Sequence, residues 1–217
     1  MDAQQFLAEF GHIANAPGGI ERLRELIYQF AVTGRLVPQQ PEDGDAAVVL
    51  ENVARARQQL ISEKRFKRAA KLESELLIAP AIALPTSWRW SRLLDLGEIN
   101  PRNVAEEDAD ATFVPMAAVS EKHGEPVGGE EAFWGEISKG YTHFGNGDVL
   151  VAKITPCFEN GKAATVTGLK HGIGAGSTEF HVFRPISEDV NPAYVYLFLR
   201  SPLFRIKGQS SMTGTAG

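Results

Sequence analysis

Apolar residues recur along this chain at two different periods, and the period changes part-way. Between residues 18 and 33 they fall at three- and four-residue steps, which is the spacing of one helical face. Gly34 follows that run, at the position where a left-handed residue commonly ends a helix. The pattern therefore predicts an amphipathic helix whose apolar face is formed by Ile20, Leu23, Ile27, Phe30 and Ala31.

A second helical pattern begins after a polar linker. Pro38 disfavours helical geometry at the residue before it, and the sequence PQQPEDGD then supplies turn-forming residues. Asp45 is a suitable N-cap for a helix that either continues toward Ile78 or breaks near Ser62. We expect residues 1–80 to form a helical region whose two segments pair as a helical hairpin. The apolar face of the second segment carries Val49, Val53, Ala56 and Leu60.

Strand patterns follow a Pro-rich boundary at residues 80–85. Short runs rich in β-branched and aromatic residues then alternate with Gly-rich separators. Pro192 suits the first turn of a helix, and Pro202 breaks the helical pattern in two. The predicted fold class is therefore α+β, in which a mixed, mainly β domain with short C-terminal helices occupies residues 84–217. The predicted strands are 113–116, 141–144, 148–154, 163–166 and 179–183.

The stretch 147–185 predicts a rigid sheet that presents polar loops. An apolar strand ends there in a polar, Pro-containing tip, and a second strand follows. The tip contains ENGK, in which Asn160 and Gly161 favour the positive φ angles of a hairpin. The Gly-rich run 171–176 is expected to be a turn before the third strand, STEFHVFRP.

The motifs that suggest catalysis lack the context that catalysis needs. A glycine-rich cofactor loop needs a strand before it and a helix after it, whereas a strand follows residues 171–176. NPAY resembles an amino-methyltransferase motif, but Ala193 stands where that motif has a second proline. ENGK is one residue too long for the Glu-x-Lys of metal-dependent nucleases. Cys157 has no nucleophile signature, and the histidines lack metal-ligand spacing. We predict no catalytic site and no metal site.

Composition and charge narrow the function further. The chain has 217 residues, of which 43% are hydrophobic, so a sizeable core is expected. A net charge of -5 excludes nucleic-acid binding by bulk charge, so any such binding must rest on local patches or on a partner. The single cysteine excludes an internal disulfide, and no signal peptide or membrane-spanning run is visible, which predicts a cytoplasmic protein.

One basic cluster is open to two interpretations. It lies C-terminal to Ser62, and it is either a solvated helix face or a contact for phosphates or an acidic partner. Its members are Lys64, Arg65, Lys67, Arg68 and Lys71.

Several motifs, taken in order, resemble the specificity subunit (HsdS) of type I restriction–modification systems. They are LRELIYQFAVTGRLVPQ, LPTSWRWSRLLDLG, GDVLVAKITPCFENGKAA, GSTEFHVFRP, and YVYLFLRSPLFR running to MTGTAG. Together they cover most of the chain. The resemblance implies an N-terminal fragment that ends before the spacer helix of the family. Residues from 84 onward would form the first target recognition domain, which reads one half of a bipartite DNA sequence without catalysis. The helical region would contact other subunits.

The resemblance also implies partners, cofactors and contact residues. The partners are double-stranded DNA, methyltransferase subunits, and restriction subunits that join through the methyltransferase complex, with no membrane. S-adenosylmethionine, ATP and Mg²⁺ are expected only on partner subunits, so this chain has no cofactor of its own. Polar loop residues are the implied DNA contacts, since Lys, Asn, Ser and Thr supply directional hydrogen bonds. These residues are Lys153, Thr155, Asn160, Lys162, Lys170, Thr178, Ser210, Ser211, Thr213 and Thr215.

Two other function classes stay open. The acidic total charge favours a protein-interaction scaffold that holds partners without reading DNA. A small methyltransferase built on GIGAG and NPAY is the second, and it would bind S-adenosylmethionine.

Overall fold

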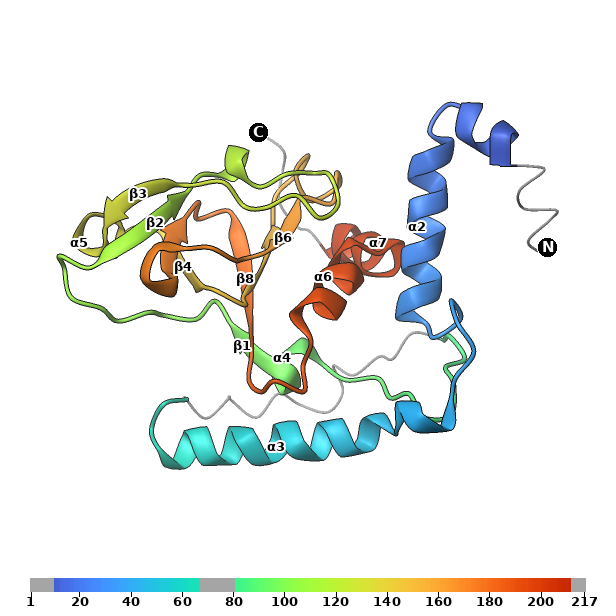
Figure 1. Cartoon of the computed structure of the whole chain (residues 1–217), viewed down its shortest axis with the longest axis horizontal. Helices are drawn as coiled ribbons and strands as arrows, with labels where there is room; N and C mark the ends of the chain where they lie inside the picture. Colours follow the sequence, from blue (N-terminus) through green and yellow to red (C-terminus); the bar gives the residue numbers. More distant parts are fainter. Residues whose placement is uncertain (1–9, 67–80, 212–217) are drawn as a thin grey trace.

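Two small β-sheets and a set of flanking helices make up the protein (Figure 1). The computed structural model describes residues 10–66 and 81–211, and therefore not Lys67, Arg68 and Lys71 of the basic cluster. Helices precede the sheets in the chain, and two short helices follow them. The predicted α+β class is thus confirmed.

Predicted signals mark the C-terminal end of the first helix and the start of the second. Helix α2 spans Gly19–Val32, and Gly34 follows it with a φ of 68°. Helix α3 spans Ala46–Ser62, and Asp45 caps it by accepting a hydrogen bond of 2.8 Å from the backbone N–H two residues later. A 3₁₀ turn over Pro41–Asp43 lies in the linker. Helix α3 therefore breaks at Ser62 and not near Ile78.

The two helices do not form the predicted hairpin. Helix α2 packs against α6 (Pro192–Arg200) and α7 (Pro202–Ser211), whereas α3 lies against α4 (Leu93–Leu96) (Figure 1). The linker is held by tertiary contacts, because Gln39 Oε1 accepts a hydrogen bond of 2.7 Å from Trp88 Nε1. The segment after the Pro-rich boundary thus occupies the corner between the helices and keeps them apart.

Helix α2 buries a different face from the one that carries its apolar repeat. Tyr28 and Val32 are 7% and 2% exposed, whereas Ile20, Ile27 and Phe30 are 37%, 42% and 42% exposed. Successive helical residues are about 100° apart, so the buried stripe lies roughly a third of a turn from the apolar repeat. The helix therefore carries an apolar face that nothing in the described residues covers fully.

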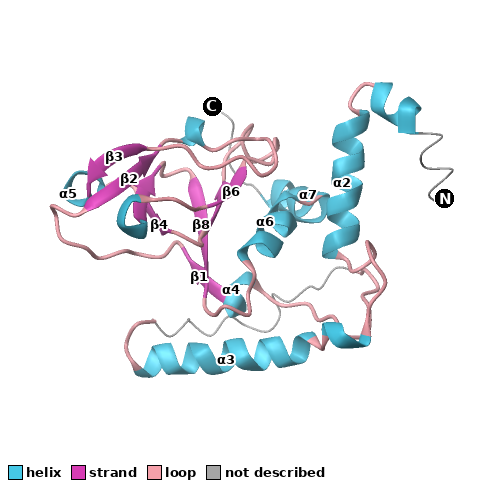
Figure 2. Cartoon of the chain, in the orientation of Figure 1, coloured by secondary structure: helices cyan, strands magenta, loops and turns pink. Residues whose placement is uncertain are grey.

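The strands form two four-stranded sheets (Figure 2). The first is antiparallel and has the order β1 (Gly97–Ile99), β8 (Phe180–Pro185), β5 (Val149–Ala152) and β6 (Ala163–Thr165). The second contains one parallel pair, β2 with β7, and has the order β3 (Glu130–Phe133), β2 (Asp110–Val114), β7 (Ile173–Gly176) and β4 (Thr142–Gly145). Strands β2, β4, β5, β6 and β8 match the five predicted runs, whereas the sequence pattern does not predict β1, β3 or β7.

Strand β7 replaces most of the predicted glycine-rich turn. It pairs with β2 on one side and with β4 on the other. A Cβ atom at Gly174 would lie 2.7 Å from the carbonyl oxygen of Thr112, so glycine is needed for the close approach of the two backbones. The chain turns earlier, at His171 and Gly172, whose φ angles are 46° and 72°. These glycines serve sheet packing as well as a turn.

The first sheet is covered on both faces. Val149 and Phe183 on one face pack with Leu199 of α6. Leu150 on the other face packs with Phe144 of the second sheet. The layers are therefore helices, first sheet and second sheet, and the polar loops extend from the ends of the sheets (Figure 2).

Candidate nucleic-acid interface

The loop between β5 and β6, residues 153–162, is the tip predicted from the sequence. Phe158 is 5% exposed and anchors this tip in the core, and its N–H donates to Ile154 O at 2.8 Å. Gly161 has a φ of 70°, as predicted, whereas Asn160 does not have a positive φ. The tip is thus a folded loop with a buried aromatic anchor and not a plain hairpin turn.

Two predicted DNA-binding residues of the tip make hydrogen bonds within the protein. Asn160 Nδ2 donates to Glu121 Oε1 at 3.0 Å, and Lys162 Nζ donates to Met116 O at 3.3 Å. Both acceptors belong to the connection between β2 and β3, which begins with a 3₁₀ turn over Met116–Ala118. These side chains tie two loops together, and contact with DNA would compete with that role.

Three other predicted residues lie at one end of the first sheet, beside its two central strands β5 and β8. Lys153 N–H donates to Glu179 O at 2.9 Å, which sets the start of the tip beside the turn before β8. Thr155 and Thr178 are exposed and Lys153 is half-buried. This reading edge, as we name the region of Lys153, Thr155 and Thr178, offers an ammonium group and two hydroxyls.

Two residues that the sequence does not single out extend the reading edge. Asn100 has a φ of 51°, and its N–H and Oδ1 bond to the carbonyl and N–H of Val182 at 2.8 and 3.0 Å. Its Nδ2 lies 3.5 Å from His181 Nδ1. Burial, followed by the charge of Lys153, lowers the pKa of His181, so its imidazole is neutral at pH 7 and offers one donor and one acceptor. An Asn after a strand end is a signal for a left-handed residue, but strand β1 itself is not evident from the sequence.

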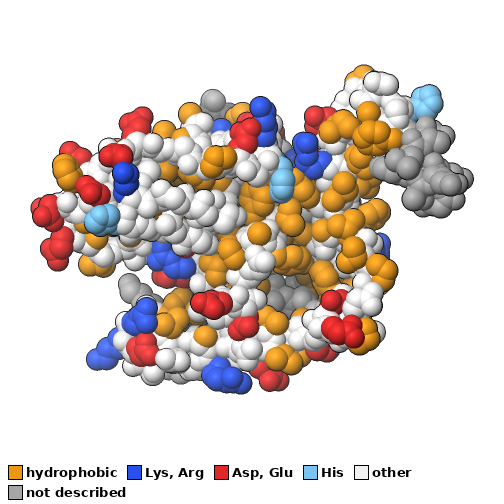
Figure 3. Space-filling model, in the orientation of Figure 1, with side chains coloured by type: hydrophobic (Ala, Val, Ile, Leu, Met, Phe, Trp, Pro, Cys, Tyr) orange, Lys and Arg blue, Asp and Glu red, His pale blue; other side chains and the backbone are white. Residues whose placement is uncertain are grey.

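Lys170 lies apart from the tip and the reading edge, at an acidic end of the second sheet. Its Nζ is 2.7 Å from Glu131 Oε1, and this hydrogen bond raises the pKa of Lys170. Acidic side chains gather at this end of the molecule (Figure 3). A phosphate backbone would be repelled there. The exposed acidic residues are Glu106, Glu107, Asp108, Asp110, Glu130 and Glu131.

The predicted C-terminal loop is helical where the structure describes it. Helix α7 extends to Ser211, and Ser210 Oγ donates back to Lys207 O at 2.8 Å. The predicted loop conformation is wrong for Ser210 and Ser211, because these residues continue the helix that starts at Pro202. Thr213 and Thr215 lie outside the described residues.

An ion pair with a buried carboxylate fixes the connection that leads from β1 toward β2. Asp148 is 1% exposed and accepts two hydrogen bonds from Arg184, at 2.9 and 2.7 Å. Arg184 Nη2 also donates to Asn103 Oδ1 at 2.9 Å, and Asn103 N–H donates to His143 Nδ1 at 3.2 Å. Burial lowers the pKa of His143, and its Nε2 lies 2.8 Å from Ser138 O. Both ring nitrogens are engaged, so this network is structural and not reactive.

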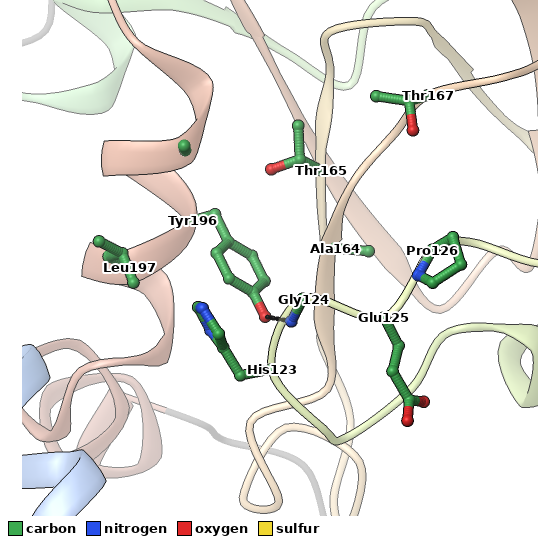
Figure 4. A pocket seen from close by; sticks show the side chains of 10 residues that line it. His123, Gly124, Glu125, Pro126, Ala164, Thr165, Thr167, Tyr196 and Leu197 are labelled. Carbon is green, nitrogen blue, oxygen red and sulfur yellow. Dashed lines mark hydrogen bonds between the residues drawn. The ribbon is translucent and has the colours of Figure 1, made fainter.

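A groove of about 390 Å³ separates α6 from the loop after β2 (Figure 4). The Tyr196 hydroxyl accepts a hydrogen bond of 3.3 Å from Gly124 N–H. His123 lies beside that ring, with the ring centroids 5.4 Å apart, and Thr165 and Thr167 line the groove opposite. Among the residues that line this groove, no nucleophile is hydrogen-bonded to a base.

Within residues 10–66 and 81–211, no three His, Cys, Asp or Glu side chains are placed to hold a metal ion. In the same part of the chain, no helix combines the length and apolar content needed to cross a membrane. The Cys157 thiol is free and half-buried.

Known proteins resemble this chain in sequence. No family model matches it. Two type I restriction enzyme specificity subunits of Escherichia coli match 200 residues, or 92% of this chain: that of EcoAI at 44% identity and that of EcoEI at 42%. Over most of its length the chain is therefore similar to type I specificity subunits. The recognition from ordered motifs is thereby confirmed.

The chain spans about a third of these specificity subunits, 34% of each. A solved structure on complex assembly and conformational transition of the type I restriction–modification system contains a chain that matches 62% of this one. The TM-score is 0.50 at 23% identity, and the match covers 35% of that chain, which supports the fold. Both named relatives are specificity subunits, in agreement with the predicted non-catalytic role.

Proposed function

We propose that this chain is the DNA sequence-recognition module of a type I specificity subunit. It would read one half of a bipartite target and direct methyltransferase and nuclease subunits to that target in the cytoplasm. The observation that carries the proposal is the 44% identity to the EcoAI specificity subunit over 92% of the chain. Polar loops on a sheet that is packed on both faces support it, because base reading needs directional groups on a rigid scaffold.

Base reading in this proposal takes place at the reading edge. Lys153, Thr155 and Thr178 supply donors and hydroxyls there, and Asn100 and His181 add an amide and an imidazole. Such groups match the donor and acceptor pattern of the major groove, where a good bidentate contact discriminates by roughly 1–3 kcal/mol. S-adenosylmethionine, ATP and Mg²⁺ would reside on partner subunits, so this chain would perform no chemical step.

The exposed apolar face of α2 supports the proposed contact with methyltransferase subunits. Ile20, Leu26, Ile27 and Phe30 are each 37–48% exposed, and hydrophobic side chains gather over this helix in Figure 3. A continuous apolar face on a surface helix is a common protein-interaction site. In this proposal the helical region docks on the partner while the β domain faces DNA.

A scaffold that does not read DNA is the second candidate function. The acidic end of the second sheet and the net charge of -5 favour it, because both disfavour contact with phosphates. The two candidates differ in one observable property, since only a reader changes the target sequence when its loops change.

Co-expression with the cognate methyltransferase subunit separates the two candidates. Methylation-sensitive sequencing of host DNA would be compared for the intact protein and for a version in which residues 84–217 come from a relative of different specificity. We expect one half of a bipartite adenine-methylated motif to change while the other half stays. An unchanged motif, with the complex still active, would favour the scaffold.

A further inference from the structure

Arg200, on α6, forms hydrogen bonds to two loops that are far apart in the sequence. It is 7% exposed, its Nη1 donates to Gly161 O at 2.8 Å, and its Nη2 donates to Glu121 O at 2.6 Å. Its guanidinium carbon lies 5.5 Å from the centre of the Tyr196 ring. One buried side chain therefore holds both the tip and the loop that bonds to Asn160.

Arg205, on α7, makes the second connection to the tip. Its Nη1 donates to Glu159 O at 2.8 Å, and its Nη2 pairs with Glu25 Oε1 of α2. The side chains of this ion pair are 19% and 42% exposed. Arg205 thus links the tip directly to the helix that carries the exposed apolar face.

The chemistry of these contacts suits arginine. Carbonyls at 121, 159 and 161 receive these hydrogen bonds in loops, and the planar guanidinium can donate from several N–H groups at fixed angles. A lysine carries its three N–H donors on one nitrogen, so it cannot reproduce the separated, coplanar donor positions of the guanidinium. Because Arg200 is buried, water cannot readily replace its hydrogen bonds, and losing them leaves carbonyls unpaired.

We propose that Arg200 and Arg205 are positioning residues for target recognition. They hold the tip in one geometry against the 120–127 loop, and the Arg205–Glu25 pair couples that geometry to the position of α2. The inference rests on the proposed function and goes beyond it, because it assigns a recognition role to side chains that do not contact DNA. A recognition loop must be held within about 0.5 Å to discriminate bases, which explains why two arginines serve one short loop.

The test compares methylation of the cognate sequence with methylation of sequences changed at one base of the half-site. The assembled complex would carry Arg200→Lys, Arg205→Lys or Glu25→Gln, with Arg55→Lys and Glu21→Gln as controls on exposed helix positions. A purely structural defect lowers the active fraction equally for every sequence, so it leaves the ratio of rates unchanged. Loss of positioning lowers the ratio.

We expect Arg200→Lys to lower the ratio about fivefold or more, the lower end of what one base contact discriminates. Arg205→Lys and Glu25→Gln should lower the ratio less than Arg200→Lys does. The double variant Arg205→Lys/Glu25→Gln should have a ratio no lower than that of the more affected single variant, because both substitutions disrupt the same ion pair. If the ratios of methylation rates are unchanged in these variants while the wild-type complex produces its bipartite motif, this inference is wrong and the proposed function is retained. The absence of any bipartite motif for the wild-type complex would reject the proposed function and this inference with it.

Discussion

At the residue scale, the predicted contact residues differ in whether their side chains already form hydrogen bonds within the protein. Lys162 and Asn160 donate to Met116 O and Glu121 Oε1, whereas Thr155 and Thr178 are exposed at the reading edge. A side chain that must break an internal hydrogen bond before it binds DNA gains less from the new contact. Among the predicted contact residues, those of the reading edge are therefore the ones whose side chains are more available for a new contact.

Lys153→Ala should weaken DNA binding by the assembled complex. The loss of one phosphate or base contact corresponds to about 1 kcal/mol or more, or roughly fivefold in affinity. Fluorescence anisotropy with a cognate duplex would measure it. Lys139→Ala is the matched control, because Lys139 is exposed near the acidic end, and it should change affinity less. Equal and negligible effects would place the DNA on another face.

The lowered pKa of His143 predicts that the folded protein loses stability at low pH. Burial lowers its pKa, and its Nδ1 accepts a hydrogen bond from Asn103 N–H, so protonation competes with a native contact. As the pH falls through the ordinary histidine value of 6.5, the unfolded chain takes up more protons than the folded chain. The free energy of unfolding therefore decreases. Burial also lowers the pKa values of His123 and His181, which adds to the same trend.

Thermal unfolding at pH 7.5 and at pH 5.5 would measure this dependence. We expect a lower melting temperature at pH 5.5, and a smaller difference in the variant His143→Gln, which cannot be protonated. A difference as large in the variant as in the wild type would show that His143 does not contribute.

At the scale of elements, the sequence pattern locates helices more reliably than it assigns their buried faces. The ends of α2 follow from a local glycine, but its buried side follows from contacts with α6 and α7. Tyr28 packs against His123 at a ring-centroid distance of 5.5 Å, a contact between residues far apart in the sequence. The apolar repeat of α2 is therefore partly exposed and does not enter the core.

Ile27→Glu on α2 should leave folding nearly intact but reduce assembly. The side chain is 42% exposed, so we expect a change in the free energy of unfolding within about 1 kcal/mol. Co-purification with the methyltransferase subunit should fall at least about tenfold, because a charge would be buried in an apolar interface. Val32→Ala is the contrasting variant: Val32 is 2% exposed, so we expect a loss of about 2 kcal/mol in stability with assembly retained. Intact assembly of Ile27→Glu would refute this role of the helix.

Strand β7 shows how close backbone packing can hide a strand in a glycine-rich sequence. Gly174→Ala should destabilise the protein by roughly 2 kcal/mol or more, since its Cβ would lie 2.7 Å from Thr112 O. Gly128→Ala is the control, because the nearest atom to its Cβ would be at an ordinary 3.6 Å. Chemical denaturation would compare the two variants. Equal stability would mean that the sheet adjusts without cost.

At the scale of the whole molecule, charge is distributed unevenly. The acidic end of the second sheet lies away from α2, and the chain as a whole carries a net charge of -5 (Figure 3). The proposed role is compatible with this charge, because partners would supply most phosphate contacts while this chain would supply selectivity. The molecule therefore places its candidate partner helix and its acidic end at opposite sides.

The salt dependence of DNA binding should differ between this chain alone and its complex. The slope of log affinity against log salt is about -0.9 for each phosphate contact, so a chain that contacts few phosphates should show a shallow slope. We expect a slope near -1 to -2 for the chain and a steeper slope for the complex, measured by anisotropy between about 50 and 200 mM salt. A steep slope for the isolated chain would contradict shared affinity.

The sequence by itself determined features that depend on neighbours in the chain. The C-terminal end of α2, the starts of α3 and α6, and five strands were predictable, because caps, prolines and side-chain periodicity act over a few residues. The resemblance to type I specificity subunits followed from the order of longer motifs. The sequence could not predict the pairing of α2 with α6 and α7, strand β7, or the convergence of Asn100 and His181.

These latter features were decided by the tertiary structure, because each depends on contacts between distant segments. Glycines in β7 are read locally as a turn, yet their small size permits a sheet once β2 and β4 lie on either side. Arg200 is likewise an ordinary helix residue in the sequence, and only the fold brings Glu121 and Gly161 to it. The local sequence pattern determines which helices and strands form. Packing between distant segments determines which side chains stay exposed and available for binding.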